Sequence, residues 1–430
     1  MLDAFLYILG ILIFLVGIAL SVGLHELGHY LPARRFGVQV RQFMVGFGPT
    51  LFSRMRGETE FGVKAFPLGG YILMAGMYPP ARKQYKGLFA NWINDARKEI
   101  ESQEEADESR KFYQLSAPKK MAIMLGGPVM NLLLGVLLIL ISMSGIGTLQ
   151  NSLTVDEVYQ CLEQDASGNC EDGAPATPAS AAGLKSGDQV TAVNGQNVSN
   201  WTEVTKLLDG RKISELTVLR DGTNRQLTIE PLFMERAVYD SLGNLQLDQQ
   251  GIPITQLTPV LGIRLQGVTQ PLPIDQSLSF AGASMVSMAG FIVELPQQVY
   301  QVTLSTLGLA ERDPNGAVSI VGVGQLAGEL TAADIGVDAK LASLLLLLGS
   351  LNLVLFVFNL VPLLPLDGGH VVGAIYEGAK RRFVRAVRGV DPGPIDTAKT
   401  LPLAYFVWLV LIFTGLLLIL ADLVNPITLG

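Results

Sequence analysis

The chain has 430 residues, of which 49% are hydrophobic and only 16% are charged, and its formal net charge is −7. This composition is typical of a membrane protein and argues against a water-soluble enzyme. The chain has no basic patch interleaved with aromatic residues, so it does not have the pattern of a nucleic-acid-binding protein.

Four stretches are apolar over enough residues to cross a bilayer, which takes about 20 residues for roughly 30 Å of hydrocarbon. They are residues 4–24, 121–144, 341–364 and 401–423. The first stretch lacks the basic N-terminal region of a signal peptide and is longer than a signal-peptide core. We therefore expect it to be retained as the first of four transmembrane helices.

The first span ends in His25-Glu26-Leu27-Gly28-His29. Positions i and i+4 lie on one face of a helix, so both imidazoles can bind one ion, with Glu26 beside that face. The pattern is that of a zinc-hydrolase helix. Two interfacial histidines at a helix end are the alternative, but ionisable groups in a span are costly and normally functional. We therefore predict a Zn²⁺ site that takes a further ligand from elsewhere in the chain.

Lysine and arginine concentrate in the segments 32–120 and 371–400, whereas the long segment 148–340 is acidic. The positive-inside rule places the two basic segments in the cytoplasm, and the acidic segment and both termini outside. The first and third spans then both run inward. Their polar ends are thereby predicted to lie at the same depth, near the cytoplasmic side.

Residues Glu60 to Met77 show partial alternation of apolar and polar side chains around the turn signal Pro67-Leu68-Gly69-Gly70. This pattern predicts a β-hairpin. An edge strand there could accept an extended peptide by β-addition if the hairpin is associated with the membrane. An ordinary amphipathic cytoplasmic hairpin is the alternative.

The external segment contains a strand pattern at Gln189 to Val193, a turn at Asn194-Gly195 and a helix start at Trp201. This order resembles a PDZ domain of the kind found in bacterial proteases, and we assign it to residues 148–235. Residues 236–340 include a helical apolar stripe from Phe280 to Leu304, which fits either core packing or the outer membrane surface.

The two cysteines, Cys161 and Cys170, both lie in the external segment. Their short separation predicts a local disulfide in an oxidising compartment, with two free thiols as the alternative. The stretch between them looks like an insertion near the peptide groove of the PDZ-like region. It therefore argues for a gate that excludes large ectodomains rather than for conventional binding of a carboxylate tail.

The third span ends in Leu366-Asp367-Gly368-Gly369-His370, preceded by Pro362 and Pro365. The prolines and glycines predict a helix break, which survives at membrane depth only where it is buried in protein or lines a cavity. We expect the same of Gly126-Gly127-Pro128 in the second span. Asp367 and His370 are both candidates for the third metal ligand.

These motifs together resemble the site-2 protease family of intramembrane zinc metalloproteases, in particular bacterial members with four spans and one external PDZ domain. The resemblance is carried by His25-Glu26-Leu27-Gly28-His29, Gly46-Phe47-Gly48-Pro49, Pro67-Leu68-Gly69-Gly70-Tyr71, Gly127-Pro128-Val129-Met130-Asn131 and Asn359-Leu360-Val361-Pro362-Leu363-Leu364-Pro365-Leu366-Asp367-Gly368. The pairing of the first and the last motif is the most specific part.

The resemblance implies a role for each site residue. Asp367 would be the third zinc ligand beside His25 and His29, and Glu26 the general base. Asn359, Gly69 and Gly70 would bind the substrate or stabilise the oxyanion. Asn131 and His370 would have a structural or outer-sphere role.

The implied activity is hydrolysis of peptide bonds within transmembrane segments. Its substrates would be single-span regulators such as anti-sigma factors, cut beforehand by another protease, or remnant signal peptides, in the bacterial plasma membrane. The alternatives are a catalytically idle PDZ receptor or scaffold with a structural metal, and a metal transporter. The intact Glu26 argues against the first, and the single histidine pair beside a PDZ-like region argues against the second.

The predicted architecture is a polytopic α-helical membrane protein with a membrane-associated β-hairpin and an external PDZ domain of α/β type. Its parts are the first span with the histidine motif (1–31), the hairpin segment (32–120), the second span (121–147), the PDZ domain (148–235), the following external region (236–340), the third span with Asp367 (341–370), the basic loop (371–400), the fourth span (401–423) and an external tail (424–430).

Overall fold

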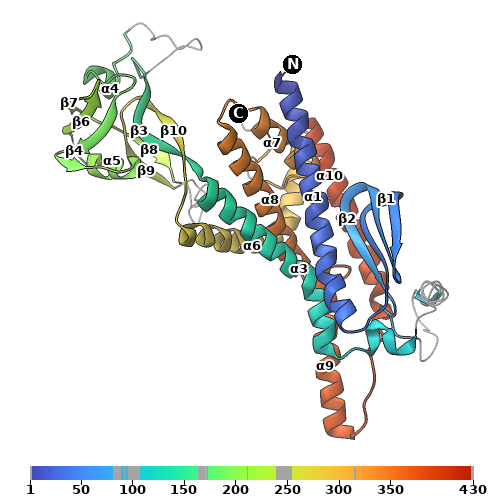
Figure 1. Ribbon diagram of the computed structural model, residues 1–430. Coiled ribbons are helices and arrows are strands. Elements are labelled where there is room, and N and C mark those ends of the chain that lie inside the picture. The colour runs from blue at the N-terminus through green and yellow to red at the C-terminus, as the bar shows by residue number, and fades with distance from the viewer. Residues whose placement is uncertain are drawn as a thin grey trace. The chain divides into compact units, whose positions relative to one another are not determined.

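Helices and strands separate into two units in the computed structural model of the chain (Figure 1). One unit combines Met1–Ser144 with Pro273–Gly430, and the other is Gly145–Leu272. The structure describes residues 2–427 apart from 81–88, 92, 95–106, 163–169, 171–172, 211, 239–253 and 314–315.

The first unit is mainly helical. Its elements are α1 (Leu2–Arg35), β1 (Val40–Arg56), β2 (Thr59–Met74), η1 (Glu108–Arg110), η2 (Phe112–Gln114), α3 (Ala117–Leu140), η3 (Ile141–Ile146), α6 (Ile274–Thr306), α7 (Ile320–Ala332), α8 (Val337–Asn359), α9 (Asp367–Arg388), η4 (Thr397–Thr400) and α10 (Leu401–Val424). Helix α1 packs on α7 and α8 through an apolar cluster that includes Phe14, Ile18, Ala327 and Leu348.

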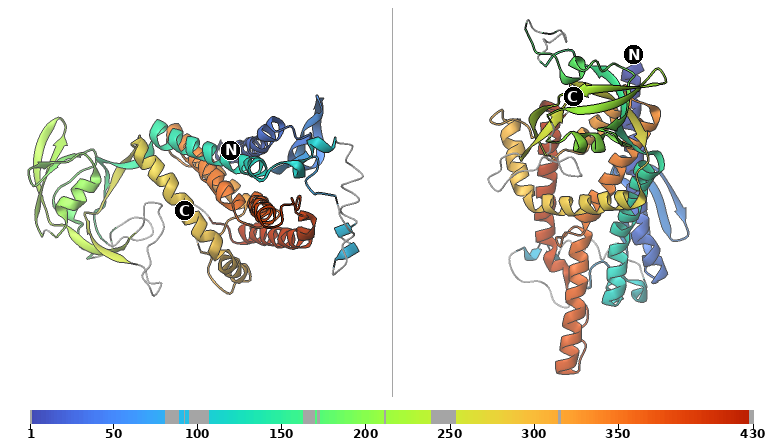
Figure 2. Two further views of the ribbon diagram at one scale, coloured as in Figure 1. Left: turned by 90° about the horizontal axis from the view of Figure 1, so that it is seen from below. Right: turned by 90° about the vertical axis from the view of Figure 1, so that its left-hand side faces the viewer.

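Five helices in the described part of the chain are long and apolar enough to cross a membrane. Four of them, α1, α3 with η3, α8 and α10, cover most of each predicted span, although α8 ends at Asn359 and the third span was expected to reach residue 364. The fifth is α6, the least apolar of the set. It contains Pro296, a residue that kinks helices, and it changes direction along its length (Figure 2, right).

The prediction of a break in the second span is wrong, because α3 runs without interruption through Gly126, Gly127 and Pro128. The break in the third span is present: α8 ends at Asn359, and α9 begins at Asp367 after a non-helical connection. Most of the segment expected to be a basic loop is helical, since α9 continues to Arg388.

The hairpin is formed by β1 and β2, which pair antiparallel beside α1 (Figure 1). Its turn lies at Gly57 and Glu58, so the expected turn at Pro67–Gly70 is wrong. That segment lies inside β2, where Gly70 pairs with Val45 and the register is irregular. The positive φ of Gly69, +141°, is available to glycine and explains how a turn-like sequence fits into a strand.

The second unit contains β3 (Thr148–Val158), α4 (Pro178–Ala181), β4 (Gln189–Val193), β5 (Gln196–Asn197), α5 (Trp201–Leu208), β6 (Ser214–Arg220), β7 (Thr223–Ile229), β8 (Leu232–Ala237), β9 (Thr255–Val260) and β10 (Ile263–Gln270). The main sheet has the order β10-β3-β4-β6-β7, and β5 pairs with β4. Because β10 pairs with β3, this unit extends beyond residue 235, where the domain boundary was expected.

An ion pair with a buried carboxylate joins the residue before β4 to the end of β6 in the second unit. Arg220 donates two hydrogen bonds of 2.6 Å to the carboxylate of Asp188, and the backbone N–H of Lys185 donates a third. Burial raises the pKa of Asp188, but these hydrogen bonds outweigh it and hold the pKa below its ordinary value.

We expect Arg220→Met to destabilise the second unit by about 3 kcal/mol at pH 7, because it leaves a buried carboxylate unpaired. A lowered pKa in the folded state means that the pair stabilises the fold above about pH 3.9, the unfolded value, and that this contribution disappears as the pH falls through the folded pKa. The difference in free energy of unfolding between variant and wild type should therefore become smaller at acidic pH. Hydrogen exchange of the β4 and β6 amides in the full chain measures this free energy. A difference that does not change with pH would contradict the role of the ion pair.

Candidate metal centre

The structure brings His25, His29 and Asp367 together from α1 and the first turn of α9. The Nε2 atoms of the two histidines are 3.1 Å apart. Asp367 Oδ2 is 3.3 Å from Nε2 of His25 and 3.4 Å from Nε2 of His29. Ligand atoms about 2 Å from a tetrahedral zinc ion lie about 3.3 Å apart, so the three atoms have the spacing that one ion requires.

The hydrogen bonding of these side chains also fits a metal. Asp367 Oδ2 is buried and has no hydrogen-bond partner among the described residues, although two imidazole nitrogens lie close to it. A buried acceptor without a partner costs free energy, and a cation between the three atoms would remove that cost. In the part of the chain that the structure describes, these residues are the one group of histidine, cysteine and acidic side chains arranged to hold an ion.

His29 is oriented from outside the cluster. Its Nδ1 lies 2.8 Å from the carbonyl oxygen of Ile123 on α3. A neutral imidazole that donates from Nδ1 presents the lone pair of Nε2 to the metal, which is the usual arrangement around histidine ligands. The carbonyl of Ile123 belongs to a position that the sequence alone did not indicate.

The glycines of α3 let it approach the histidines closely. A Cβ atom on Gly127 would lie 2.6 Å from Cε1 of His29 and 2.8 Å from Cε1 of His25, and one on Gly28 would collide with the backbone of Gly126. Small residues at crossings let membrane helices pack in this way. The three glycines thus serve the site by close packing, whereas the sequence had suggested a broken helix.

We expect Gly127→Ala to lower zinc content strongly, because the new methyl group displaces the ligand rings. Gly415→Ala on α10 is the control, since its Cβ would meet nothing within 4 Å. Zinc per chain by elemental analysis of the purified variants is the measurement. Equal, stoichiometric zinc in both variants would contradict this account of the crossing.

Glu26 is buried next to the histidine pair, with 7% of its surface exposed. The hairpin approaches α1 at this residue: a Cβ on Gly70 would lie 2.9 Å from Cγ of Glu26. A Cβ on the neighbouring Gly69 would collide with the ring of Phe47. The structure therefore places both predicted glycines on the strand that covers Glu26.

The other predicted residues lie outside the cluster. Asn359 is the half-buried last residue of α8. Asn131 is one turn beyond Gly127 on α3, and neither polar atom of its buried side chain has a partner among the described residues. His370 is one turn after Asp367 and lines a separate cavity of about 340 Å³ with Tyr113 and other residues.

The sequence also did not indicate the polar connections between helices, of which two lie on the helices that form the site. Asn352 of α8 donates a hydrogen bond of 2.9 Å to Ser21 of α1, one turn before His25. Lys120 of α3 pairs with Glu377 of α9 at 2.8 Å. The sequence signal for the second was Glu377, an acidic residue just before the basic run Lys380 to Arg388 of α9.

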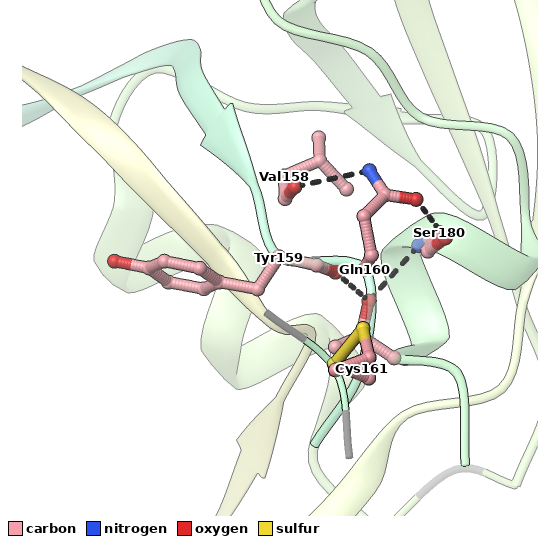
Figure 3. The surroundings of a disulfide bond; sticks show 7 residues. Val158, Tyr159, Gln160, Cys161 and Ser180 are labelled. Atoms are coloured by element: carbon pink, nitrogen blue, oxygen red, sulfur yellow. Dashed lines mark hydrogen bonds between the residues drawn. A yellow bond between two sulfur atoms is a disulfide. The ribbon is translucent and has the colours of Figure 1, made fainter. Parts of the chain in front are cut away.

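The cysteines of the second unit form a disulfide, with Cα atoms 5.7 Å apart (Figure 3). Cys161 follows β3, and the adjacent Gln160 accepts a hydrogen bond of 3.1 Å from Ser180 of α4. The disulfide thus lies where the end of β3 meets α4.

Comparison with known proteins agrees with this geometry. The sequence profile of peptidase family M50 matches residues 13–388. Zinc metalloprotease Rip1 of Mycobacterium tuberculosis is 33% identical over 99% of both chains, and Rip1 of Mycolicibacterium smegmatis is 31% identical over 98% of both. Metalloprotease MmpA of Caulobacter vibrioides is 28% identical over 89% of both. The chain therefore belongs to peptidase family M50, the site-2 proteases, and is an intramembrane zinc metalloprotease.

Proposed function

We propose that His25, His29 and Asp367 hold the catalytic zinc ion and that Glu26 is the general base. The observation that carries this assignment is the spacing of 3.1 to 3.4 Å between the three ligand atoms. Zinc, when bound, polarises the substrate carbonyl and lowers the pKa of a water molecule toward about 7.

The protein's own residues then handle the proton. A carboxylate oxygen of Glu26 accepts a proton from the attacking water and passes it to the nitrogen of the departing amine. The tautomer of His29 is held by the carbonyl of Ile123, so its Nε2 stays free for the ion. Asn359 is proposed to bind the substrate backbone or the developing oxyanion, because it lies at the end of α8 just before the connection to Asp367.

The proposed substrates are transmembrane segments of single-span proteins, either regulators of the anti-sigma type that another protease has already cut, or remnant signal peptides. A helical peptide bond must become extended before water can attack it. The hairpin lies against Glu26 and presents exposed apolar side chains, among them Phe47, Phe52 and Phe66. An edge strand of this kind can accept an extended apolar chain by β-addition.

We propose four spans, namely α1, α3, α8 and α10, with both termini outside and the metal site near the cytoplasmic side. Helices α1 and α8 run in the same direction, because Gly17 lies against Leu348 and Ser21, one turn further on, accepts a hydrogen bond from Asn352. The chain between α3 and α8 must therefore return to the side from which it left. If α6 crossed the membrane, a second helix would have to cross back before α8, and α7, with 13 residues, is too short to do so. We therefore propose that α6 lies on the outer membrane surface.

For the second unit we propose an external PDZ domain that acts as a size gate. The order of β4, β5, α5, β6 and β7 supports this assignment. The Cys161–Cys170 disulfide beside α4 alters the region where a carboxylate tail would bind, which favours a gate over a tail-binding pocket.

The function is tested by reconstituting the purified protein in lipid with a model transmembrane peptide. We expect cleavage within the apolar segment, loss of cleavage after zinc is removed with a chelator, and recovery on addition of one zinc per chain. Stoichiometric zinc without cleavage of any transmembrane peptide would instead support a receptor or scaffold with a structural metal.

A further inference from the structure

The two helices that supply the metal ligands are both held by α3. Helix α1 contacts it at the Gly28–Gly126 crossing and through the contact between His29 and the carbonyl of Ile123. Helix α9 also packs on α3, where Nζ of Lys120 lies 2.8 and 2.9 Å from the two carboxylate oxygens of Glu377. The relative position of the histidine pair and Asp367 thus depends on how each helix is attached to α3.

The Lys120–Glu377 pair is buried, with 6% and 4% of the two side chains exposed. Ions this deep are tolerated only when closely paired, so loss of Glu377 removes the carboxylate that compensates the buried Lys120. Loss of Lys120 leaves Glu377 paired with Arg381, 3.5 Å away on the same helix, a contact that does not tie α9 to α3. One lysine contacts both oxygens of Glu377, so the carboxylate has little freedom to slide or rotate. The pair therefore defines one register of α9 on α3.

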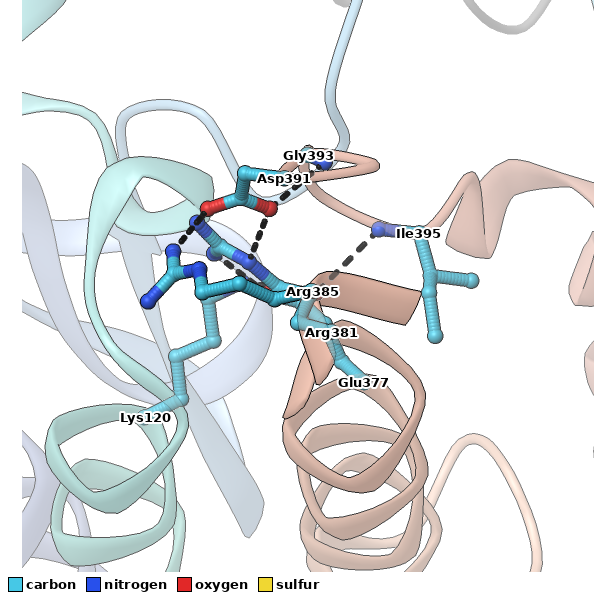
Figure 4. Close-up of polar contacts among 7 residues, drawn as sticks. All are labelled: Lys120, Glu377, Arg381, Arg385, Asp391, Gly393 and Ile395. Atoms are coloured by element: carbon cyan, nitrogen blue, oxygen red, sulfur yellow. Dashed lines mark hydrogen bonds and ion pairs between the residues drawn. The ribbon is translucent and has the colours of Figure 1, made fainter. Parts of the chain in front are cut away.

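Further contacts fix the same part of α9 (Figure 4). Glu377 accepts a hydrogen bond of 3.3 Å from the backbone N–H of Ile395. Asp391 accepts hydrogen bonds of 2.7 Å from Arg381 and 2.6 Å from Arg385, two residues on the following turns. The chain that leads to α10 is thereby folded back onto α9 at the level of the ion pair.

Helix α9 transmits this constraint to the metal centre. Glu377 follows Asp367 by ten residues in one unbroken helix, a rise of about 15 Å. The connection from α8 to α9 is non-helical and contains Pro362 and Pro365, so α8 does not determine the rotation of α9 through continuous helix. A change of register at Glu377 would move the carboxylate of Asp367 relative to the histidines.

We propose that Lys120 and Glu377 are positioning residues for the metal: their ion pair sets the register of α9 and hence the distance from Asp367 to His25 and His29. This inference rests on the ligand set proposed above. Neither residue touches the ligand atoms, so the pair acts only through the two helices. Removal of a group that bonds directly to a metal ligand commonly lowers metal affinity about 10- to 100-fold, and we expect a loss of this size when the helix that carries the ligand loses its attachment.

The chain offers a matched control in a second buried ion pair. Arg312 and Asp422 are 2.7 Å apart, with 6% and 1% of their side chains exposed. This pair joins the end of α10 to the segment before α7, where Asp422 also accepts a hydrogen bond from the N–H of Ser319. It is about as buried as the Lys120–Glu377 pair, but it lies on neither α3 nor α9.

The test measures zinc affinity by competition with a chromogenic chelator, on the full chain in detergent and without substrate. We expect Lys120→Met and Glu377→Gln each to weaken zinc binding about 10- to 100-fold. Arg312→Met should lower the thermal midpoint comparably and leave zinc affinity close to that of wild type.

A milder variant keeps the test decisive if the neutral substitutions do not fold. Glu377→Asp retains the charge but shortens the side chain by one methylene, so α9 must shift to keep the pair, and we expect a severalfold loss of zinc affinity. Unchanged affinity in Glu377→Asp, or an equal loss in Arg312→Met, would overturn the proposal. Wild-type affinity in Asp367→Ala would instead refute the ligand set, which separates the two failures.

Discussion

Glu26→Gln is expected to bind one zinc per chain and to lose cleavage of a transmembrane peptide by at least about 10²- to 10⁴-fold, the usual contribution of a general base. The amide keeps the size of the side chain and its packing against Gly70, but it cannot accept the proton of the attacking water. Zinc remains because Glu26 is not among the three clustered ligand atoms. Zinc content and cleavage rate are measured on the same reconstituted sample.

The matched control for this prediction is Glu294→Gln, the same chemical change at an exposed position of the apolar helix α6. It should leave both zinc and cleavage at wild-type values. Cleavage at the wild-type rate by Glu26→Gln would refute its role as base. Loss of zinc from the same variant would instead indicate that Glu26 helps to hold the metal.

Asp367→Ala should lose zinc and activity together, and His370→Ala should retain zinc. The two residues are one helical turn apart, and the sequence alone left both as candidates for the third ligand. The structure places Asp367 Oδ2 within 3.4 Å of both histidine nitrogens, whereas His370 lines a cavity with Tyr113. Loss of a group that merely supports a ligand typically weakens metal binding about 10- to 100-fold. Loss of one of the three ligands themselves should weaken zinc binding by more than this.

Elemental analysis after gel filtration in a metal-free buffer distinguishes the two variants. A His370→Ala protein without zinc, or an Asp367→Ala protein with one zinc per chain, would exclude the proposed set of ligands. If both variants keep zinc, the third ligand lies elsewhere in the chain.

The ion pair between Lys120 and Glu377 lies outside the proposed ligand set, but it attaches α9, the helix that carries Asp367, to α3. Helices α1, α3 and α9 meet at the site, and the proposed ligands come from α1 and α9. Helix α3 provides a carbonyl for His29, a glycine that admits both rings and a lysine that fixes α9. Substitutions on α3 should therefore affect the metal although none of its side chains binds it.

The local patterns of the sequence determined the parts that depend on near neighbours. Apolar length alone located four helices that could span a membrane, because crossing hydrocarbon requires about 20 apolar residues in succession. The i, i+4 spacing alone placed His25 and His29 on one helix face. The break before Asp367 was also readable, since Pro362 and Pro365 disfavour continued helix.

Only the tertiary structure decided what depends on contacts between distant segments. It brought Asp367 Oδ2 within 3.4 Å of both histidine nitrogens, placed the hairpin turn at Gly57–Glu58, and turned a suspected break at Gly127 into a close helix crossing. The sequence was ambiguous there because glycine permits a bend and a close approach equally well. Which of the two occurs is determined by the neighbouring helix, and no local pattern contains that information.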